Sequence, residues 1–266
     1  MQEYIKTDRQ IHWLSQVIAK ANRTYVPAKK DDSHTNLYFD AVGKRVLGHW
    51  IKSPDGEIML ALNLDSLSYE WIDKKQNILY EVSVFNKNSK QLEKSVADYL
   101  LSIGMNTEYF YKPLHFEIPD YKTVKLDESD ISENGVKSWL FFRELANQAC
   151  QAMAGYLQVE SEIRIWPHHF DTGIFAQATE DLGLGFGLAT EDSMIGQPYF
   201  YLSGYKGESP ISYKNFNKLS AGRWQTGQYW NGAVLPFSEI LHFSPVEASD
   251  AIRDFIKETT NWFLHQ

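Results

Sequence analysis

The sequence lacks the features that mark several large classes of protein. It contains one cysteine, Cys150, among 266 residues, which excludes an intramolecular disulfide. No apolar run approaches the roughly 20 residues that a membrane-spanning helix needs. The N-terminal residues lack the charged-then-apolar pattern of a signal peptide. We therefore expect a soluble cytoplasmic protein that makes no membrane contact.

Positive charge is also scarce. The chain has 26 Lys and Arg residues against 34 Asp and Glu, and its formal net charge is −8 at pH 7. Such a chain has no positive field to attract nucleic acid or an anionic membrane, and no local cluster of basic residues overrides the total. We expect no nucleic-acid partner. The sequence leaves the oligomeric state unknown.

The common cofactor and nucleophile motifs are missing as well. Residues 183–187 read Gly-Leu-Gly-Phe-Gly, but they lack the strand-to-helix setting and the glycine spacing of a dinucleotide loop. Glycine at alternate positions instead predicts that a ring or another backbone approaches this strand closely. Neither a phosphate loop nor a Gly-x-Ser-x-Gly motif occurs, so the cofactor is unknown. Cys150, in an alanine-rich helix without basic neighbours, is predicted to be a buried structural thiol.

Aromatic residues, by contrast, are abundant at 14% of the chain. They bury large areas and keep a polar tip, which suits both a large core and a ligand cleft. In the first part of the chain, helical spacing of apolar residues predicts a helix over residues 8–24. Alternating segments between residues 37 and 84 predict strands, joined by polar turns at 53–56 and 73–77 into an antiparallel meander. A further helix starts near Ser89 and is stopped by Gly104.

The second part of the chain repeats this order of elements. An offset of 131 residues carries the apolar face of the first helix onto Phe142, Leu145, Ala149 and Ala152. Strands are predicted near 162–165, 184–189, 197–202 and 232–236, and a capping box at 244–247 begins a last helix. The prediction is an α+β fold with two similar halves, each an antiparallel sheet covered by helices. Internal duplication and two unrelated halves with one pattern both stay open.

We expect the chain to divide into residues 1–104, a connector over 105–138, and residues 139–266, all in one compact unit. If the halves are repeats, the second has a longer excursion over residues 204–231, which contains Trp224. Such a long segment is either a lid over a cleft or a surface excursion packed on its own aromatic side chains. The sequence favours neither.

Residues 164–173 concentrate more chemistry than any other stretch of the chain. If they are extended, Trp166 and His168 share one side of the strand while His169 and Asp171 share the other. His169 then becomes a candidate catalytic base and Asp171 the acid that orients it, or both become metal ligands. The structural alternative is that a histidine bonds backbone at the strand end and Asp171 begins a turn. Both interpretations remain open.

Other residues are candidates for ligand binding. His34 and Asp40 lie where the offset places them opposite the motif of the second half, and Tyr199 and Tyr201 lie on a later strand. The metal is unknown, because the chain has no His-Glu-x-x-His motif and no cysteine pair.

The run Trp166-Pro167-His168-His169-Phe170-Asp171, followed by Pro198-Tyr199-Phe200-Tyr201, resembles a bacterial family of domains of unknown function. That family carries a Trp-Pro-x-His-Phe-Asp motif and a later Pro-Tyr-x-Tyr strand. The resemblance implies a common fold and no particular reaction.

Three functions follow as expectations. The first is binding of a small polar or aromatic ligand in a cleft, and the residues assigned to it are Trp166, His168, Tyr199, Tyr201, His34, Asp40 and Trp224. The second is a hydrolase-like enzyme that uses His169 and Asp171, with or without a metal. The third is a protein-interaction module. A pocket lined by these residues would favour the first two.

Overall fold

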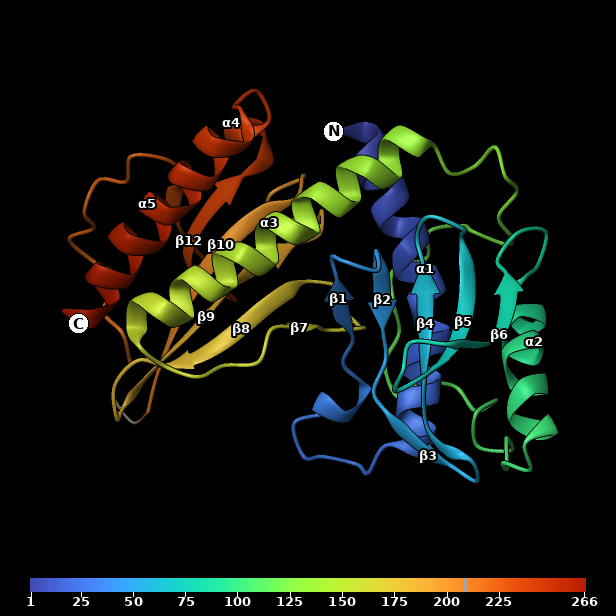
Figure 1. The fold of residues 1–266 in the computed structure, drawn as a ribbon. Coiled ribbons are helices and arrows are strands. Elements are labelled where there is room, and N and C mark those ends of the chain that lie inside the picture. Colours follow the sequence, from blue (N-terminus) through green and yellow to red (C-terminus); the bar gives the residue numbers. More distant parts are fainter. Residues whose placement is uncertain (208–209) are drawn as a thin grey trace. The chain divides into compact units, whose positions relative to one another are not determined.

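The computed structural model describes residues 1–207 and 210–266, which form helices and two antiparallel sheets of six strands each (Figure 1). This confirms the predicted α+β class. The chain forms two compact units. Unit 1 consists of Met1–Phe141 and Ile165–Phe170, and unit 2 of Phe142–Arg164 and Asp171–Gln266. The segment 105–138 thus belongs to unit 1, and the boundary cuts through the motif between Phe170 and Asp171.

Unit 1 begins with one long helix and continues into its sheet. The elements are α1 (Gln2–Tyr25), the 3-10 turn η1 (Ser33–Thr35), β1 (Tyr38–Asp40), β2 (Arg45–Leu47), β3 (Ile51–Ser53), β4 (Gly56–Asn63), β5 (Ser68–Asp73), β6 (Ile78–Ser83) and α2 (Ser89–Ser102). The strand order is β1-β2-β4-β5-β6, and β3 also pairs with β4. Every pair is antiparallel. The meander predicted from the alternating segments is therefore confirmed.

Local sequence explains most of these elements. The apolar face predicted for α1, including Ile11, Leu14 and Ile18, is fully buried. In the turn between β5 and β6, Asp73 Oδ1 accepts hydrogen bonds from the backbone N–H groups of Lys75 and Asn77. Helix α2 starts with a capping box at Asn88, and Gly104 follows its end with a φ of +79°.

Unit 2 contains a mixed order of helices and strands. The elements are α3 (Glu133–Leu157, which begins in unit 1), β7 (Arg164–Ile165, whose second residue belongs to unit 1), β8 (Thr172–Gln177), β9 (Leu182–Ala189), β10 (Tyr199–Lys206), β11 (Arg223–Thr226), β12 (Asn231–Pro236), α4 (Phe237–Ile240) and α5 (Pro245–Leu264). The strand order is β11-β12-β10-β9-β8-β7. Helix α5 carries the predicted capping box between Ser244 and Glu247, with proline at its start.

Helices α3 and α5 run side by side and cover one face of the unit 2 sheet (Figure 1). On that face, the ring of Phe142 from α3 stacks on Phe237, which in turn contacts Phe200 of β10. Phe263 of α5 closes on Gly204, where a side chain would meet its ring. These contacts make a core of aromatic rings above the sheet.

The structure corrects two predictions about unit 2. Strand β8 was not among the predicted strands. Ala152 was predicted to lie on the buried face of α3, but it is exposed, and Cys150 and Met153 are buried instead.

The two units share the order helix, sheet, helix, but their short strands pair differently. Strand β3 pairs with β4, whose other neighbours are β2 and β5, whereas β11 is an edge strand beside β12. The internal duplication therefore remains a prediction.

The excursion after β10 contains β11 and packs on α5. Trp224 stacks on Phe216 with ring centroids 4.8 Å apart, and lies 4.5 Å from the ring of Trp262 on α5. Its indole N–H donates to the carbonyl of Asn217. These contacts favour the surface excursion packed on aromatic side chains over a mobile lid. Residues 208 and 209 of the predicted segment lie outside the described residues.

Candidate functional site

The motif residues of unit 1 form a turn rather than a strand. Residues 167–169 are a turn closed by the Phe170 backbone N–H, which donates to the Trp166 carbonyl at 2.6 Å. The predicted extended conformation of 166–171 is therefore wrong. Instead of pointing to opposite sides, the rings of His168 and His169 lie next to each other, with centroids 4.3 Å apart. Proline explains the difference, since its fixed φ and missing N–H favour a turn here.

Phe170 ends this turn in an unusual backbone conformation. Its φ is +59°, in the left-handed region that residues other than glycine rarely adopt. The side chain supplies the compensation, because its fully buried ring stacks on His12 with centroids 4.6 Å apart and an interplanar angle of 4°. The ring of Trp139 stacks on it at 6.2 Å. Phe170 thus packs on two rings of unit 1.

Two side chains of α1 fix the Pro167 carbonyl. Buried His12 contacts this oxygen through Nε2 at 2.9 Å, and Gln16 donates to it at 2.8 Å. Because a carbonyl oxygen only accepts, Nε2 of His12 carries the proton. Nδ1 of the same ring hydrogen-bonds the hydroxyl of Tyr121, 2.7 Å away. The turn, α1 and the segment around Tyr121 are joined by one buried imidazole.

A pocket lies beside this turn, within unit 1. It has a volume of about 330 Å³, and its walls come from α1, the start of α2 and residues 113–118. The lining residues include Trp13, Val17, Leu92, Leu114, Phe116 and Ile118. Phe116 also contacts the ring of His168, with centroids 5.5 Å apart. Gln16 both lines the pocket and bonds the Pro167 carbonyl. We call this cavity the α1–α2 pocket.

An ion pair lies in the wall of the α1–α2 pocket, whose other polar lining residues are Gln16, Ser89 and the exposed Glu117. Lys20 Nζ of α1 lies 2.6 Å from Glu93 Oε1 of α2, and the two side chains are only 15% and 12% exposed. Partial burial removes water from both charges, which costs free energy that their attraction and hydrogen bonds must offset. The ammonium has three N–H donors, so the pair is able to bond a polar ligand as well.

In unit 2, Asp171 bonds to Tyr201. The Tyr201 hydroxyl donates to Asp171 Oδ2 at 2.7 Å. Gly173 and Gly187 make room for this hydroxyl, since a Cβ at either position would lie 3.0 Å from it. Burial, and then the charge of Asp171, raise the pKa of Tyr201 well above its usual value. Tyr201 therefore remains a hydrogen-bond donor that orients Asp171.

The neighbouring Tyr199 has a local role. Its hydroxyl donates to Asp192 Oδ2 at 2.6 Å, and the other oxygen of Asp192 accepts the backbone N–H groups of Met194 and Ile195. Burial first, and then the hydrogen bond to Asp192, raise the pKa of Tyr199. The pair closes the loop between β9 and β10.

His34 and Asp40 also make local contacts in unit 1. His34 is buried, and its Nδ1 accepts the backbone N–H of Lys29. Asp40 Oδ1 accepts the N–H groups of Val42 and Gly43 in the turn between β1 and β2. Such bonds stabilise loops, and the structure explains both residues without a ligand.

His169 is exposed and belongs to unit 1, whereas Asp171 belongs to unit 2. Their pairing as a base and its orienting acid remains a prediction. Among residues 1–207 and 210–266, no group of three or more His, Cys, Asp or Glu side chains is arranged to hold a metal ion. Cys150 is buried, and burial followed by the charge of Asp171 raises the pKa of its thiol, which confirms the prediction of a structural thiol.

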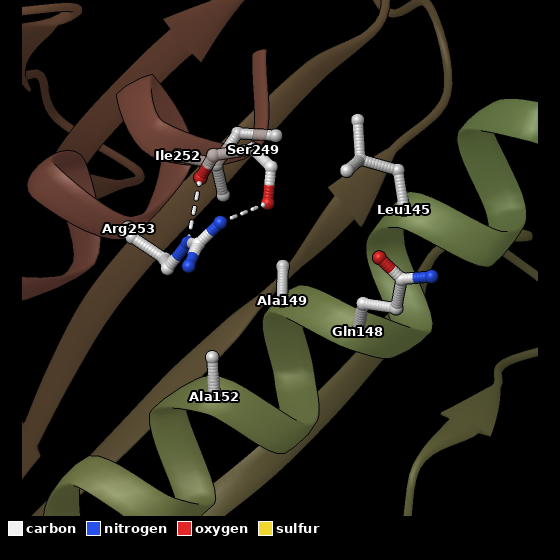
Figure 2. Close-up of a pocket in the computed structure, with 7 residues that line it drawn as sticks. All are labelled: Leu145, Gln148, Ala149, Ala152, Ser249, Ile252 and Arg253. Atoms are coloured by element: carbon white, nitrogen blue, oxygen red, sulfur yellow. Dashed lines mark hydrogen bonds between the residues drawn. The ribbon is translucent and has the colours of Figure 1, made fainter. Parts of the chain in front are cut away.

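A second cavity, of about 220 Å³, lies in unit 2 between α3 and α5 (Figure 2). On the α3 side it is lined by the small side chains of Ala149 and Ala152. Arg253 lines it on the α5 side. The guanidinium of Arg253 bonds the carbonyl and hydroxyl of Ser249, one turn earlier in its own helix. This groove offers no converging set of polar groups.

Sequence analysis missed the residues that form the α1–α2 pocket. Gln16 of the pocket and His12, one turn before it on α1, read as polar residues of an amphipathic helix, and both contact Pro167, which is more than 150 positions away. Phe116 and Lys20 likewise carry no local motif.

The chain matches no known protein-family model, no curated protein and no solved structure. In the part of the chain that the structure describes, no helix is long and apolar enough to cross a membrane.

Proposed function

We propose that the protein binds a small aromatic ligand with a polar group in the α1–α2 pocket. The observation that carries the proposal is the largely buried Lys20–Glu93 ion pair beside the apolar side chains of a pocket that also contains Gln16, Ser89 and Glu117. A volume of about 330 Å³ falls in the range of ligand sites, which are mostly apolar with a few fixed polar groups. Trp13 and Phe116, both half-buried, supply flat surfaces for an aromatic ring.

The polar group of the ligand would bond the ion pair while its ring contacts Phe116. Lys20 donates and Glu93 accepts, so a carboxylate would bind the first and a hydroxyl or amine the second. Because Phe116 also contacts His168, ligand binding would alter the surroundings of the motif turn. We thus keep the ligand class expected from the sequence, a small polar or aromatic molecule, and propose that its cleft is the α1–α2 pocket of unit 1. The hydrolase and the interaction module remain alternative predictions.

The test is titration with three probes, indole-3-acetate, tryptamine and indole, followed by calorimetry. We expect the charged probes to bind more tightly than indole. Phe116→Ala should weaken binding about tenfold, which corresponds to about 1.4 kcal/mol. The double variant Lys20→Gln, Glu93→Gln should strongly reduce the preference for charged probes, since it removes both charges of the pair and leaves only the exposed Glu117 as a charge in the lining.

The matched control is the double variant Lys94→Gln, Asp98→Asn, which removes an exposed ion pair on α2, the helix that carries Glu93. It should leave binding of all three probes unchanged, because this pair does not line the pocket. Equal affinity of the three probes for the natural protein, or no binding at millimolar concentration, would refute the proposal.

A further inference from the structure

The register of the unit 2 sheet divides its side chains between two faces. Tyr201, Ser203 and Tyr205 of β10 lie opposite Gly187, Gly185 and Gly183 of β9, and so these residues point to the same face. Phe175 of β8 lies opposite Gly185 on that face. The other face is the one covered by α3 and α5, as the contact of Phe263 with Gly204 shows. We call the first one the glycine face.

Two aromatic rings pack against glycines on the glycine face. A Cβ at Gly183 would come within 2.2 Å of the Phe175 ring, and one at Gly185 within 3.2 Å of the Tyr205 ring. The predicted close approach of a ring to these alternate glycines is thus confirmed. The two ring centroids are 5.8 Å apart. We call Phe175 and Tyr205 the platform.

Covering glycines with rings stabilises a sheet, but it does not require the rings to stay exposed. Phe175 is 54% and Tyr205 is 55% exposed in the whole chain. Neighbouring exposed aromatic rings on a rigid sheet are the kind of surface that marks a binding site.

The polar groups at the platform are uncharged and oriented. Buried Ser203 donates its hydroxyl proton to the Tyr205 hydroxyl oxygen at 3.2 Å. Since Tyr205 accepts this bond, its own O–H is directed elsewhere and is able to donate to a ligand. Gln177 is exposed on the same face at the end of β8, and its Nε2 donates to the Thr179 carbonyl at 2.9 Å, which orients the amide and leaves its oxygen as an acceptor for a ligand.

We propose that the platform binds a neutral oligosaccharide, independently of the α1–α2 pocket. The C–H face of a sugar ring packs on the face of an aromatic ring, while sugar hydroxyls bond amide and hydroxyl groups at its edge. The uncharged platform complements a neutral ligand. Single-stranded nucleic acid also stacks on aromatic side chains, but it needs a positive groove for its phosphates. Phe175, Tyr205, Ser203 and Gln177 provide no positive charge, and the net charge of −8 opposes phosphate binding.

The experiment measures binding of the full chain to four probes by calorimetry. The probes are hexasaccharides of β-1,4-linked glucose, β-1,4-linked xylose and α-1,4-linked glucose, together with a twelve-residue oligothymidylate. We expect at least one hexasaccharide to bind and the oligothymidylate not to bind. Phe175→Ala and Tyr205→Ala should each weaken binding about tenfold. Phe175→Tyr should retain binding, because it keeps the ring.

Tyr229→Ala is the matched control, since this tyrosine is 92% exposed but lies in the turn between β11 and β12. It should bind the hexasaccharides as the natural protein does. Circular dichroism identifies any variant that fails to fold, and Phe175→Leu and Tyr205→Leu then replace the alanine variants with the ring still removed. The proposal is overturned if none of the hexasaccharides binds, if oligothymidylate binds in their place, or if folded platform variants bind them normally.

Discussion

The two units show the same order of helix, sheet and helix, but different interactions hold them together. Unit 1 relies on buried polar side chains that bond distant backbone or each other. Asn22, for example, donates to the Asn36 carbonyl and accepts the His49 N–H. Unit 2 relies on aromatic rings fitted against glycine and against one another, as in the series from Phe142 through Phe237 to Phe200. Similar element order therefore does not imply similar energetics.

This difference follows from the residues on each sheet. Unit 1 carries buried charge on its central strands, where Glu70 of β5 contacts Arg45 of β2. A buried charge is tolerated only with a partner, so it specifies which strands lie near each other.

Unit 2 also buries the charged side chain of Arg143, which donates to the Thr172 hydroxyl. Its sheet adds a steric specification, because a Cβ at Gly183, Gly185 or Gly187 would lie close to a ring or to the backbone of the neighbouring strand. The following predictions separate these two kinds of stabilisation.

The largest effect is expected from breaking the buried ion pair of unit 1. Arg45 Nε lies 2.8 Å from Glu70 Oε2, with side chains 14% and 2% exposed. Arg45→Met would leave the Glu70 carboxylate buried without its charge partner, which should cost about 3 to 5 kcal/mol. Chemical denaturation gives the free energy of unfolding, and hydrogen exchange of peptides from each unit shows which one is affected.

The control for this variant is Lys44→Met, which removes a partner of the exposed Lys44–Asp65 pair beside it in sequence. An exposed pair contributes little, so the change should stay within about 0.5 kcal/mol. If Arg45→Met lowers the free energy of unfolding no more than Lys44→Met does, buried ion pairs do not determine the strand arrangement of unit 1.

Unit 2 should respond most strongly to a single added methyl group. A Cβ at Gly187 would lie 2.3 Å from the Thr172 carbonyl oxygen and 2.8 Å from the Gly173 Cα. These are backbone atoms of the neighbouring strand, which cannot move aside without breaking the sheet. We expect Gly187→Ala to destabilise unit 2 by about 3 kcal/mol. A thermal melt combined with exchange of β8 and β9 peptides measures this, and an unchanged melting temperature would contradict it.

The two units should differ in the alkaline pH at which their stability begins to fall. Burial raises the pKa of Cys150 in unit 2, and burial raises the pKa of Tyr69 in unit 1. A raised pKa means that the folded state keeps a proton which the unfolded state loses, so stability is complete below the unfolded pKa and falls above it. The unfolded values are about 8.5 for cysteine and about 10 for tyrosine.

Unit 2 should therefore begin to lose stability at about pH 8.5, and unit 1 at about pH 10, by up to about 1.4 kcal/mol per pH unit for each group. Cys150→Ala should remove the earlier loss. Melting temperatures between pH 7 and 11 test this, and an onset below pH 10 that persists in Cys150→Ala would show that another group is responsible.

The features that were predicted correctly from sequence are local ones. The buried face of α1, the start and end of α2, and the capping box of α5 each depend on residues within a few positions of one another. Strands β2 and β3 are only three residues long, which is too short to show an alternation of apolar and polar residues. Strand β8 was also missed, and its Gly173, which the neighbouring strand β9 requires, is a residue type common in turns.

The conformation predicted for the motif at 166–171 was wrong, and the reason lies in distant contacts. The turn at 167–169 depends on His12 and Gln16, whose contacts with Pro167 are remote in sequence. The α1–α2 pocket depends in the same way on Phe116 and Lys20 meeting across distant segments. Long-range contacts of this kind leave no spacing pattern in a single sequence.

The smallest predicted effect comes from replacing a glycine of unit 2 that lies in a helix. It shows whether unit 2 is sensitive to an added methyl group only in its sheet. Gly155 lies within α3, and a Cβ there would meet no heavy atom within 4 Å. Alanine has a higher helix propensity because glycine loses more backbone entropy on folding. Gly155→Ala should therefore stabilise the protein by about 0.5 to 1 kcal/mol. The same substitution thus has opposite signs at Gly155 and Gly187.

The double variant Gly155→Ala, Gly187→Ala completes this comparison. The two changes share no contact, so their free energies of unfolding should add within about 0.5 kcal/mol. Urea denaturation of the two single variants and the double variant measures the sum. Destabilisation by Gly155→Ala would mean that glycine is required throughout unit 2, and the contrast between its helix and its ring-filled sheet would then be lost.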